Sequence, residues 1–367
     1  MKIKRVTLTH VRVPLTEVFR ISNGAIAEKD GILVGLEAGG LVGYGESSPM
    51  PGSFYSEDTP ESCWSDLTER IVPALLAAPD ITHLSVHRLL SELPVGPFSR
   101  AGVDTAVWDL EAQQQGIPLY RLLGGNRSSV ECGLAVGITP TIQDLLNGIH
   151  KYLGEGYKRL KIKIQPGWDR APLAAIRKEF GSLPLMVDAN CAYTQDDSEL
   201  LTSLDEFGLM MIEQPLPRHD LEGHARLQRV AKTPVCLDEG AEDVAAVKKA
   251  IALKACRIIN IKIQRVGGFT AALTIHDLCK DAGIPVWGGT MPELGIGGIQ
   301  TVHLATLSNF LYPTDVQSSA RWFVEDVIEP LLKARDGMLS IPDGVGNCVA
   351  LDHGVVKRYT VREKVMA

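Results

Sequence analysis

Five charged residues recur at nearly constant intervals in the middle of the chain, each at or beside the end of a short apolar segment. Lys163, Asp188, Glu213, Asp238 and Lys262 lie 25, 25, 25 and 24 residues apart. One unit of strand, loop, helix and loop has about this length, and parallel strands in such units carry their C-terminal ends on one face. The spacing therefore predicts that the five side chains meet on one rim of a barrel of alternating strands and helices.

The chain from about Val130 onward supports this prediction, because short apolar segments alternate there with amphipathic ones. Short apolar runs are typical of buried parallel strands, and amphipathic runs of the helices that cover them. We predict strands over Cys132–Ile138, Leu160–Ile164, Leu185–Asp188, Met210–Glu213, Val235–Asp238, Ile258–Ile263, Pro285–Gly288 and Phe310–Asp315. We predict helices over Ala171–Phe180, Ser198–Phe207, Asp220–Ala231, Ala241–Leu253, Thr270–Ala282 and Gly298–Ser308. A turn-rich tail follows the last strand, so the predicted fold class is α/β, a (β/α)7β TIM-type barrel.

The first third of the chain places strands before helices. Alternation over residues 3–13 and a hairpin pattern over residues 31–48 predict an antiparallel sheet. Helices are predicted at about Glu57–Leu76 and Ser99–Gln115. Strands followed by helices are typical of an α+β layer. The glycine-rich stretch at residues 40–45 lies between strands and opens no helix, so we interpret it as turn and edge packing rather than as a phosphate loop.

These patterns divide the chain into three parts. We expect an α+β capping domain at residues 1–128 and a catalytic barrel at residues 129–320. The C-terminal segment, residues 321–367, is expected to return to the cap, because chain ends usually need a partner surface. The capping domain would then be built from the N-terminal third together with the C-terminal tail.

Composition argues against several classes of function. Lys and Arg number 37 and Asp and Glu number 44, for a net charge of −7, which gives no electrostatic drive toward nucleic acid or an anionic membrane. No charge-free apolar stretch of roughly 18 residues occurs, so we expect neither a membrane span nor a signal peptide. Seven cysteines without C-x-x-C spacing indicate reduced thiols, and hence a cytoplasmic protein.

Three of the rim charges, Asp188, Glu213 and Asp238, are carboxylates on consecutive predicted strands. Three such groups would repel one another in the low-dielectric mouth of a barrel, and a divalent cation would remove that repulsion. Ligation by oxygen alone suits Mg²⁺, and also Mn²⁺. The sequence therefore predicts that these carboxylates bind one Mg²⁺ or Mn²⁺ ion.

Two lysines flank the carboxylates, Lys163 on the strand before them and Lys262 on the strand after them. Around a closed ring they should stand on opposite sides of the metal. Lys161 lies on the same strand face as Lys163, and its charge should lower the pKa of Lys163 toward the range of a base at neutral pH. A lysine base with a divalent ion suits removal of a proton α to a carboxylate, where the metal holds both oxygens of the ene-diolate.

Further motifs extend over nearly the whole chain. They are Gly45–Pro49, Ala106–Leu110, Leu119–Gly125, Val187–Asn190, Ile212–Leu216, Cys236–Glu239, Arg265–Gly268 and Trp287–Gly289. With the rim residues, they resemble the muconate-lactonizing subgroup of the enolase superfamily. Within that subgroup the chain is most similar to the branch that contains o-succinylbenzoate synthase and N-acylamino acid racemase.

Five further residues are expected to have supporting or substrate-contacting roles. Asn190 follows Asp188 by two residues in the same strand direction and would support the metal, although a turn-forming role is equally open. The resemblance implies that Glu239 orients a lysine, and Glu293, after the seventh predicted strand, would touch the substrate. Gly288 and Asp315, at the ends of the last two predicted strands, belong to the same part of the site.

The resemblance also implies that two loops of the capping domain close over the mouth of the barrel. They are residues 19–24 and residues 50–55. As lids they would set substrate specificity, whereas the alternative is plain surface loops.

Several reactions of a small-molecule carboxylate are compatible with these predicted metal ligands and lysines. The first is syn-dehydration to o-succinylbenzoate in menaquinone synthesis, with Lys163 as both base and acid and Lys262 as a positive charge. The second is racemisation of an N-acylamino acid or epimerisation of a dipeptide, in which both lysines transfer protons. The dipeptide reaction would need an acidic pair near the last strand, where Asp315 stands alone.

A muconate-type cycloisomerisation is a further alternative on the same frame. A barrel retained for binding alone is disfavoured, because all five rim charges are present. We also expect a homo-oligomer.

Overall fold

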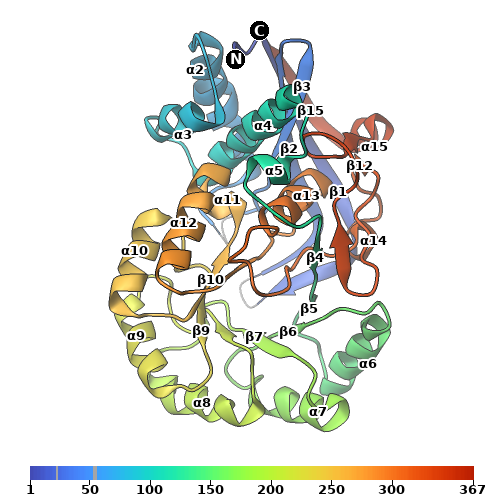
Figure 1. Cartoon of the computed structure of the whole chain (residues 1–367). Helices are drawn as coiled ribbons and strands as arrows, with labels where there is room; N and C mark the ends of the chain where they lie inside the picture. Colours follow the sequence, from blue (N-terminus) through green and yellow to red (C-terminus); the bar gives the residue numbers. More distant parts are fainter. Residues whose placement is uncertain (22–23, 53–55) are drawn as a thin grey trace.

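The computed structural model describes residues 1–21, 24–52 and 56–367. An antiparallel sheet with its helices lies at one end of the molecule, and a barrel of parallel strands lies at the other (Figure 1). The prediction of a (β/α)7β barrel with an α+β cap is confirmed. No helix in these described ranges is both long and apolar enough to cross a membrane.

The cap sheet has four antiparallel strands in the order β15-β1-β2-β3. Strands β1 (Arg5–Ile21), β2 (Gly24–Ala38) and β3 (Leu41–Ser47) come from the start of the chain. Strand β15 (Thr360–Met366) comes from its other end and pairs with β1. The tail therefore returns to the cap, as expected, and the two chain ends lie close together (Figure 1).

Two expectations for the cap were wrong. Residues 19–21 are not a loop, because β1 continues through them and pairs Phe19 with Ile26. The two expected loops also include residues 22–23 and 53–55, which lie outside the described residues. The single helix expected near residues 57–76 is three consecutive pieces, α1 (Pro60–Ser65), a π-helical turn (Asp66–Ile71) and α2 (Val72–Ala77). The first begins at Thr59, whose side chain accepts from the Ser62 backbone N–H, as an N-cap residue does.

Helix α4 (Pro97–Gln115) packs against β3 and also contacts helices of the barrel, so it connects the cap to the barrel. Helix α3 (His83–Ser91), which the sequence patterns did not predict, and the short α5 (Leu119–Leu122) complete the helices of the cap. At Gly43 and Gly45 a side chain would overlap the α4 backbone. The interpretation of the glycine-rich stretch as close packing is therefore confirmed.

The barrel wall contains seven parallel strands in chain order. They are β5 (Leu134–Val136), β6 (Leu160–Lys163), β7 (Leu185–Asp188), β8 (Ile212–Glu213), β9 (Val235–Leu237), β10 (Ile258–Ile261) and β11 (Val286–Gly288). The eighth predicted strand closes the ring through two single bridges, Phe310 to Val286 and Thr314 to Cys132. Each strand end is thereby fixed relative to its neighbours.

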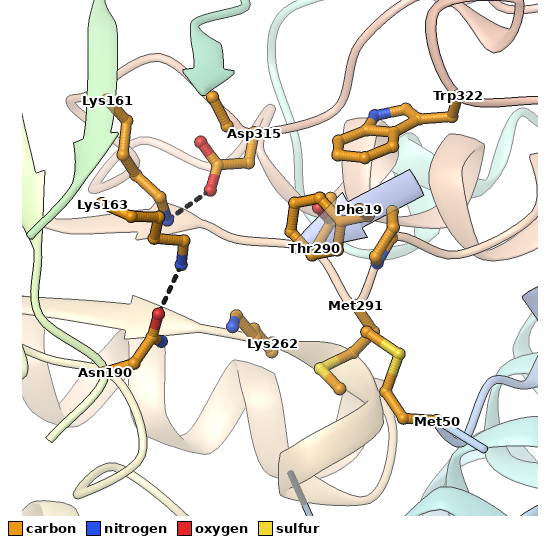
Figure 2. A pocket seen from close by; sticks show the side chains of 12 residues that line it. Phe19, Met50, Lys161, Lys163, Asn190, Lys262, Thr290, Met291, Asp315 and Trp322 are labelled. Atoms are coloured by element: carbon orange, nitrogen blue, oxygen red, sulfur yellow. Dashed lines mark hydrogen bonds and ion pairs between the residues drawn. The ribbon is translucent and has the colours of Figure 1, made fainter. Parts of the chain in front are cut away.

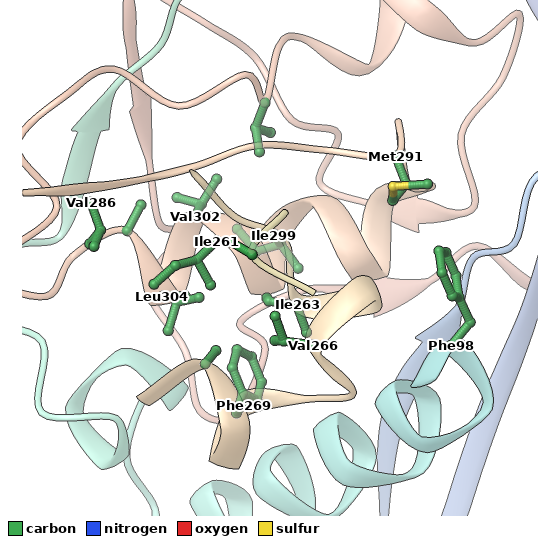
Figure 3. Packing of buried hydrophobic residues seen from close by; sticks show 14 of the residues in the cluster. Phe98, Ile261, Ile263, Val266, Phe269, Val286, Met291, Ile299, Val302 and Leu304 are labelled. Carbon is green, nitrogen blue, oxygen red and sulfur yellow. The ribbon is translucent and has the colours of Figure 1, made fainter. Parts of the chain in front are cut away.

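Helices cover the outside of the barrel (Figure 1). They are α6 (Ile142–Leu153), α7 (Arg170–Phe180), α8 (Ser198–Ser203), α9 (Leu221–Val230), α10 (Val244–Leu253), α12 (Phe269–Asp281) and α13 (Gly295–Leu304), with the short α11 (Ile263–Val266) after β10. Helical 3-10 turns at Gln195–Asp197 and Leu204–Phe207 flank α8. In the main core, Ile261, Phe269 and Val302 from β10, α12 and α13 lie close together (Figure 3).

The segment after the barrel contains short elements that run back along the molecule. They are α14 (Ser319–Trp322), β12 (Ile328–Glu329), β13 (Met338–Ser340), β14 (Ala350–Leu351) and α15 (His353–Tyr359). Strand β13 pairs with β4 (Ser129–Glu131), and β12 pairs with β14. Through these pairings the tail contacts the start of the barrel before it reaches the cap.

Candidate active site

The structure places the five rim charges together at the C-terminal ends of the strands. Lys163, Asp188 and Glu213 are successive partners in the registers of β6, β7 and β8. Asp238 and Lys262 directly follow β9 and β10. All five side chains are buried, so their charges interact through protein rather than through water.

The three carboxylates are joined into one cluster by two nitrogen donors. The Asn260 side-chain nitrogen donates to Glu213 Oε1 and to Asp238 Oδ1, both at 2.8 Å. Lys161 Nζ lies 2.9 Å from Glu213 Oε2 and 3.2 Å from Asp188 Oδ2. Because they share these donors, the three carboxylates lie close enough together to bind one ligand.

Lys161 is held as a protonated ammonium group below the rim. Burial lowers its pKa, but the negative charges of Asp315, Glu213 and Asp188 outweigh burial and raise that pKa well above its ordinary value. Its Nζ donates to Asp315 Oδ2 at 2.7 Å and lies 5.0 Å from the centre of the Trp287 ring. Trp287 belongs to a small apolar cluster with Met186, Met211, Cys236 and Ile258.

The carboxylates differ in how their charge is compensated. Burial raises the pKa of Glu213, and the neighbouring charge of Asp188 raises it further. Burial also raises the pKa of Asp188, but the positive charges of Lys163 and Lys161 outweigh burial and lower that pKa. The charges of Arg265 and Lys262 likewise outweigh burial at Asp238 and lower its pKa. Glu213 is therefore the acid whose ionisation most needs another positive charge.

This donor set fits a divalent cation with oxygen ligands. In the described part of the chain, no three acidic, histidine or cysteine side chains are arranged as a metal cage. Ammonium and amide groups contact the carboxylate oxygens instead. Burial, together with the charge of Asp188, raises the pKa of Glu213, and a further positive charge at the cluster would stabilise its ionised form. The metal ligands thus remain a prediction that the chemistry of the cluster supports.

The two rim lysines point into one cavity (Figure 2). Lys163 Nζ donates to Asp188 Oδ2 at 2.6 Å and to Asn190 Oδ1 at 2.7 Å. Lys262 Nζ donates to Asp238 Oδ2 at 2.9 Å. Each lysine is thus anchored to a different carboxylate, and both ammonium groups reach the same space.

The cavity contains about 470 Å³ of space between atoms and has two kinds of wall. The polar wall is formed by Lys161, Lys163, Asn190, Lys262 and Asp315. The other wall is largely apolar, with Phe19, Met50, Ala135, Thr290, Met291, Pro292 and Trp322. Phe19 and Met50 come from the cap, so the capping segments contribute to the site as the resemblance implied.

Hydrogen bonds connect Glu239 to Asn190 and Asn190 to Lys163. The Asn190 side-chain nitrogen donates to Glu239 Oε1 at 3.0 Å, while its oxygen accepts from Lys163. Asn190 also has a positive φ of 42°, so the turn and the polar contact occur at the same residue. Burial, with the charges of Asp238 and Asp188, raises the pKa of Glu239 to about 7. Glu239 thus reaches the lysine through an amide.

Glu293 and Gly288 are not among the described residues that line the cavity, but they form hydrogen bonds with the segments that carry lining residues. Glu293 Oε2 accepts from the Met291 backbone N–H at 2.9 Å, which fixes the segment that carries Met291. The Gly288 carbonyl accepts from Thr314 Oγ1 and from the Asp315 N–H. Neither contact shows a direct role toward a substrate.

Sequence reasoning missed three polar residues of the site: Asn260, Arg159 and Arg265. Arg159 Nη1 lies 2.8 Å from Asp315 Oδ1, and Arg265 contacts Asp238 Oδ1 with both terminal nitrogens. Arg159 precedes Lys161 by two residues and Asn260 precedes Lys262 by two. Because alternate residues of a strand share a face, this period of two was an available signal.

Comparison with known proteins places the chain in a family. Residues 144–355 match the model described as enolase C-terminal domain-like, and residues 3–124 match that of the mandelate racemase / muconate lactonizing enzyme N-terminal domain. The chain belongs to the enolase superfamily. The resemblance stated from the motifs is thereby confirmed, including its muconate-lactonizing group.

Two relatives illustrate how similar proteins of this superfamily differ in reaction. The chain is 42% identical over 361 residues to o-succinylbenzoate synthase of Geobacillus kaustophilus, covering 98% of this chain and 96% of the relative. It is also 42% identical over 351 residues to N-succinylamino acid racemase of an Amycolatopsis species, covering 95% of each. The prediction of an enolase-superfamily lyase or isomerase is confirmed at this level.

Solved structures agree with the fold. A superfamily member from Listeria innocua has a TM-score of 0.96 at 35% identity, covering 100% of this chain and 99% of its own. A dipeptide epimerase from Enterococcus faecalis, complexed with Mg and L-Leu-L-Tyr, has a TM-score of 0.88 at 28% identity, covering 95% and 100%.

Proposed function

We propose that this enolase-superfamily enzyme removes a proton α to a carboxylate with the help of Mg²⁺, and that its main reaction is syn-dehydration to o-succinylbenzoate. One observation carries the proposal: Lys163 and Lys262 reach a single cavity from different strands, next to three joined carboxylates. The relatives named o-succinylbenzoate synthase support the choice of reaction.

Asp188, Glu213 and Asp238 would hold the metal ion. The ion would supply positive charge that stabilises the substrate carboxylate as a second negative charge develops on it. The chain itself supplies further positive charge, because Lys262 projects into the cavity from the end of β10. Coordination of the carboxylates would also release the ammonium groups of Lys163 and Lys262 for contact with the substrate.

Lys163 is the proposed base. It must lose its proton before it can accept one from the substrate, and Asn190 would then keep the neutral amine oriented. In the dehydration, Lys163 returns this proton to the departing hydroxyl group on the same face. Lys262 stays protonated throughout and stabilises the negative charge that forms on the substrate.

Racemisation of an N-succinylamino acid is the second candidate, and the same two lysines favour it. One lysine would remove the proton and the other would return a proton to the opposite face. The dipeptide alternative is less well supported, because Asp315 already contacts both Lys161 and Arg159. Muconate lactonizing enzyme is similar in fold at 24% identity, and we do not favour its reaction here.

Lys262→Arg distinguishes the two reactions, because arginine keeps the charge but cannot transfer a proton near neutral pH. We expect the variant to retain part of the dehydration activity and to lose racemisation. In deuterium oxide it should still exchange the α-proton of one N-succinylamino acid enantiomer. Turnover of the cyclohexadiene carboxylate, and deuterium uptake by each enantiomer, measure these effects.

Controls on the metal and the bases accompany this experiment. Glu213→Gln should weaken Mg²⁺ binding in calorimetry, and excess chelator should abolish turnover. Full activity with chelator present contradicts the metal assignment. Exchange that survives loss of both Lys163 and Lys262 shows that the assigned bases are wrong.

A further inference from the structure

A second cavity adjoins the active site on the side away from Lys262. It contains about 780 Å³ of space between atoms, and Phe19, Ala135 and Trp322 line both cavities. The rings of Phe19 and Trp322 meet edge to face with centres 5.0 Å apart, and Figure 2 shows them side by side. The side chains of Phe19 and Trp322 therefore form part of the boundary between the cavity of the catalytic lysines and this second cavity.

Arg321, which lines the second cavity, has unusually few partners for its charge. Its side chain is only 12% exposed, and its guanidinium group lies over the rings of Tyr152 and Trp322 at 4.3 and 5.4 Å from their centres. The ion pair described for it is long, 3.8 Å from Nη1 to Glu17 Oε2. Its buried Nε has no hydrogen-bond partner among the described residues. A guanidinium group offers five donors, so this one lacks an acceptor.

The acids of the second cavity are already engaged by other groups. Glu17 Oε1 accepts from Lys151 Nζ at 3.2 Å and from the Tyr152 hydroxyl at 3.1 Å. Asp144 accepts from Thr141 Oγ1 at 2.6 Å, at the start of α6. Glu17 is therefore shared between Lys151 and, at the longer distance of 3.8 Å, Arg321. Among the described residues, no acid lies within hydrogen-bond distance of the Arg321 guanidinium group, so it can still bind an anion.

Arg321 is also held in place by the cap. The Thr16 hydroxyl donates to the Arg321 carbonyl at 2.9 Å, and the Val324 N–H donates to the Pro14 carbonyl at 3.1 Å. The register shift of β1 between Pro14 and Phe19 lies in the same region, where such irregularities redirect side chains. Arg321 is thereby fixed at the wall that also carries Phe19.

We propose that Arg321 binds the distal carboxylate of a succinyl-bearing substrate, with Phe19 and Trp322 against its methylene groups. This inference rests on the proposed function, in which both candidate reactions involve a succinyl group with a free carboxylate. The reacting end of the substrate occupies Lys163 and Lys262, and Lys161 is committed to Asp315 and Glu213. Arg321 is the buried cation of the adjoining cavity, whereas Lys151 is exposed and donates to Glu17. The planar guanidinium group can donate two parallel hydrogen bonds to a carboxylate.

The test compares two substrates that differ only at the distal end. One is an N-succinylamino acid with a hydrophobic side chain, and the other is its terminal-amide analogue, which has the same shape without the charge. We measure kcat/KM for α-proton exchange in deuterium oxide, with Mg²⁺ present. Wild-type enzyme should prefer the carboxylate, and Arg321→Met should reduce that preference by about 10- to 100-fold, as expected for a hydrogen bond between charged groups.

Two further variants make the result decisive. Arg321→Lys keeps the charge but not the planar fork, so it should restore part of the preference. Arg121→Met removes an exposed arginine that lies over Tyr120 at 5.0 Å, away from both cavities, and should keep the wild-type preference. Equal losses on both substrates, or an unchanged preference in Arg321→Met, would overturn the assignment and indicate a packing role for Arg321.

Failure of the proposed function has a different signature. Wild-type enzyme would then show neither dehydration nor α-proton exchange with any of these compounds, and this inference would fall with it. If wild-type enzyme exchanges the α-proton, the proposed function holds. The ratio of kcat/KM for the carboxylate substrate to kcat/KM for the amide substrate then tests only the role of Arg321.

Discussion

Asn260 shows how much one neutral side chain contributes to a charged site. Its nitrogen joins Glu213 to Asp238, and its oxygen accepts from the Gly289 N–H at 2.8 Å. It is fully buried, so these contacts are not exchanged for water. A single amide thereby sets the spacing of two proposed metal ligands and fixes the segment after β11.

Removal of this amide should be costly. Asn260→Ala deprives two buried carboxylates and one backbone N–H of a partner, and we expect the free energy of unfolding to fall by about 2 kcal/mol. Urea denaturation measures the change. Asn147→Ala is the control, because it removes a hydrogen bond with Gln143 on the exposed face of α6 and should change stability by less than about 0.5 kcal/mol. Similar losses in both variants contradict the role given to Asn260.

For single residues, the sequence predicted where the charged side chains lie better than it predicted which groups they contact. Equal spacing was sufficient to bring the five rim charges together, because the barrel repeats its unit. It could not show that Lys161 is surrounded by Asp315, Glu213 and Asp188, since these acids come from different strands.

At the scale of the elements, strand β3 and helix α4 approach each other closely. A Cβ atom at Gly45 would lie 2.5 Å from Thr105 Oγ1 and would overlap the Gly102 carbonyl oxygen. Two of the three nearest atoms, the Gly102 oxygen and the Ala106 nitrogen, belong to the backbone of α4, which cannot move aside as a flexible side chain could. The packing of the cap sheet on α4 therefore depends on the absence of a side chain here.

Gly45→Ala should lower the free energy of unfolding by about 3 kcal/mol, because the added methyl group overpacks this contact. Gly154→Ala is the matched control, since nothing lies within 4 Å of a Cβ at the end of α6 and the residue has an ordinary helical φ of −63°. The control should be neutral or stabilising by up to about 1 kcal/mol. Thermal or urea unfolding of both variants tests the contrast, and an unchanged Gly45→Ala stability would refute it.

Elements were predictable where the hydrophobic period was regular. The strands of the barrel agree with the structure to within a few residues, because each is a short apolar run between loops. The region from Pro60 to Ala77 was not, since a π-helical turn shifts the period in its middle. The last predicted strand makes only single bridges, which depend on its neighbours rather than on its own residues.

Across the whole molecule, the cap and barrel are joined by a buried carboxylate. Asp104 of α4 accepts from the Phe269 N–H at 2.6 Å and from Thr270 Oγ1 at 2.9 Å, at the start of barrel helix α12. Burial raises the pKa of Asp104 to about 7 despite these hydrogen bonds. The contact between the two parts is therefore sensitive to pH.

The sign of this effect follows from the raised pKa. The folded protein binds the Asp104 proton more tightly than the unfolded chain, so the resulting stability is present at low pH and lost as pH rises through about 7. Asp104→Asn cannot ionise. Between pH 5 and pH 8, wild-type protein should lose about 2.5 kcal/mol more stability than the variant. Urea denaturation across this range measures the difference, and parallel profiles would argue against it.

The overall architecture was predictable from the order of patterns along the chain, strands with helices first and then repeated strand–helix units. The return of the tail to the cap was expected as well, but its pairing partner was not. Strand β15 has mostly exposed side chains, so it lacks the alternation that assigns a strand to a sheet face. Its place beside β1 comes from backbone pairing, which composition does not reveal.

The position of β15 beside β1 also has a consequence for biosynthesis. A ribosome releases β1 first and β15 only after every strand of the barrel, so one edge of β1 has no partner for most of translation. Pairs so far apart in sequence form slowly, because a long loop must close first. Residues 6–11 of β1, which pair with β15, thus gain their second neighbouring strand last, after the ribosome has made the segments that carry all five rim charges.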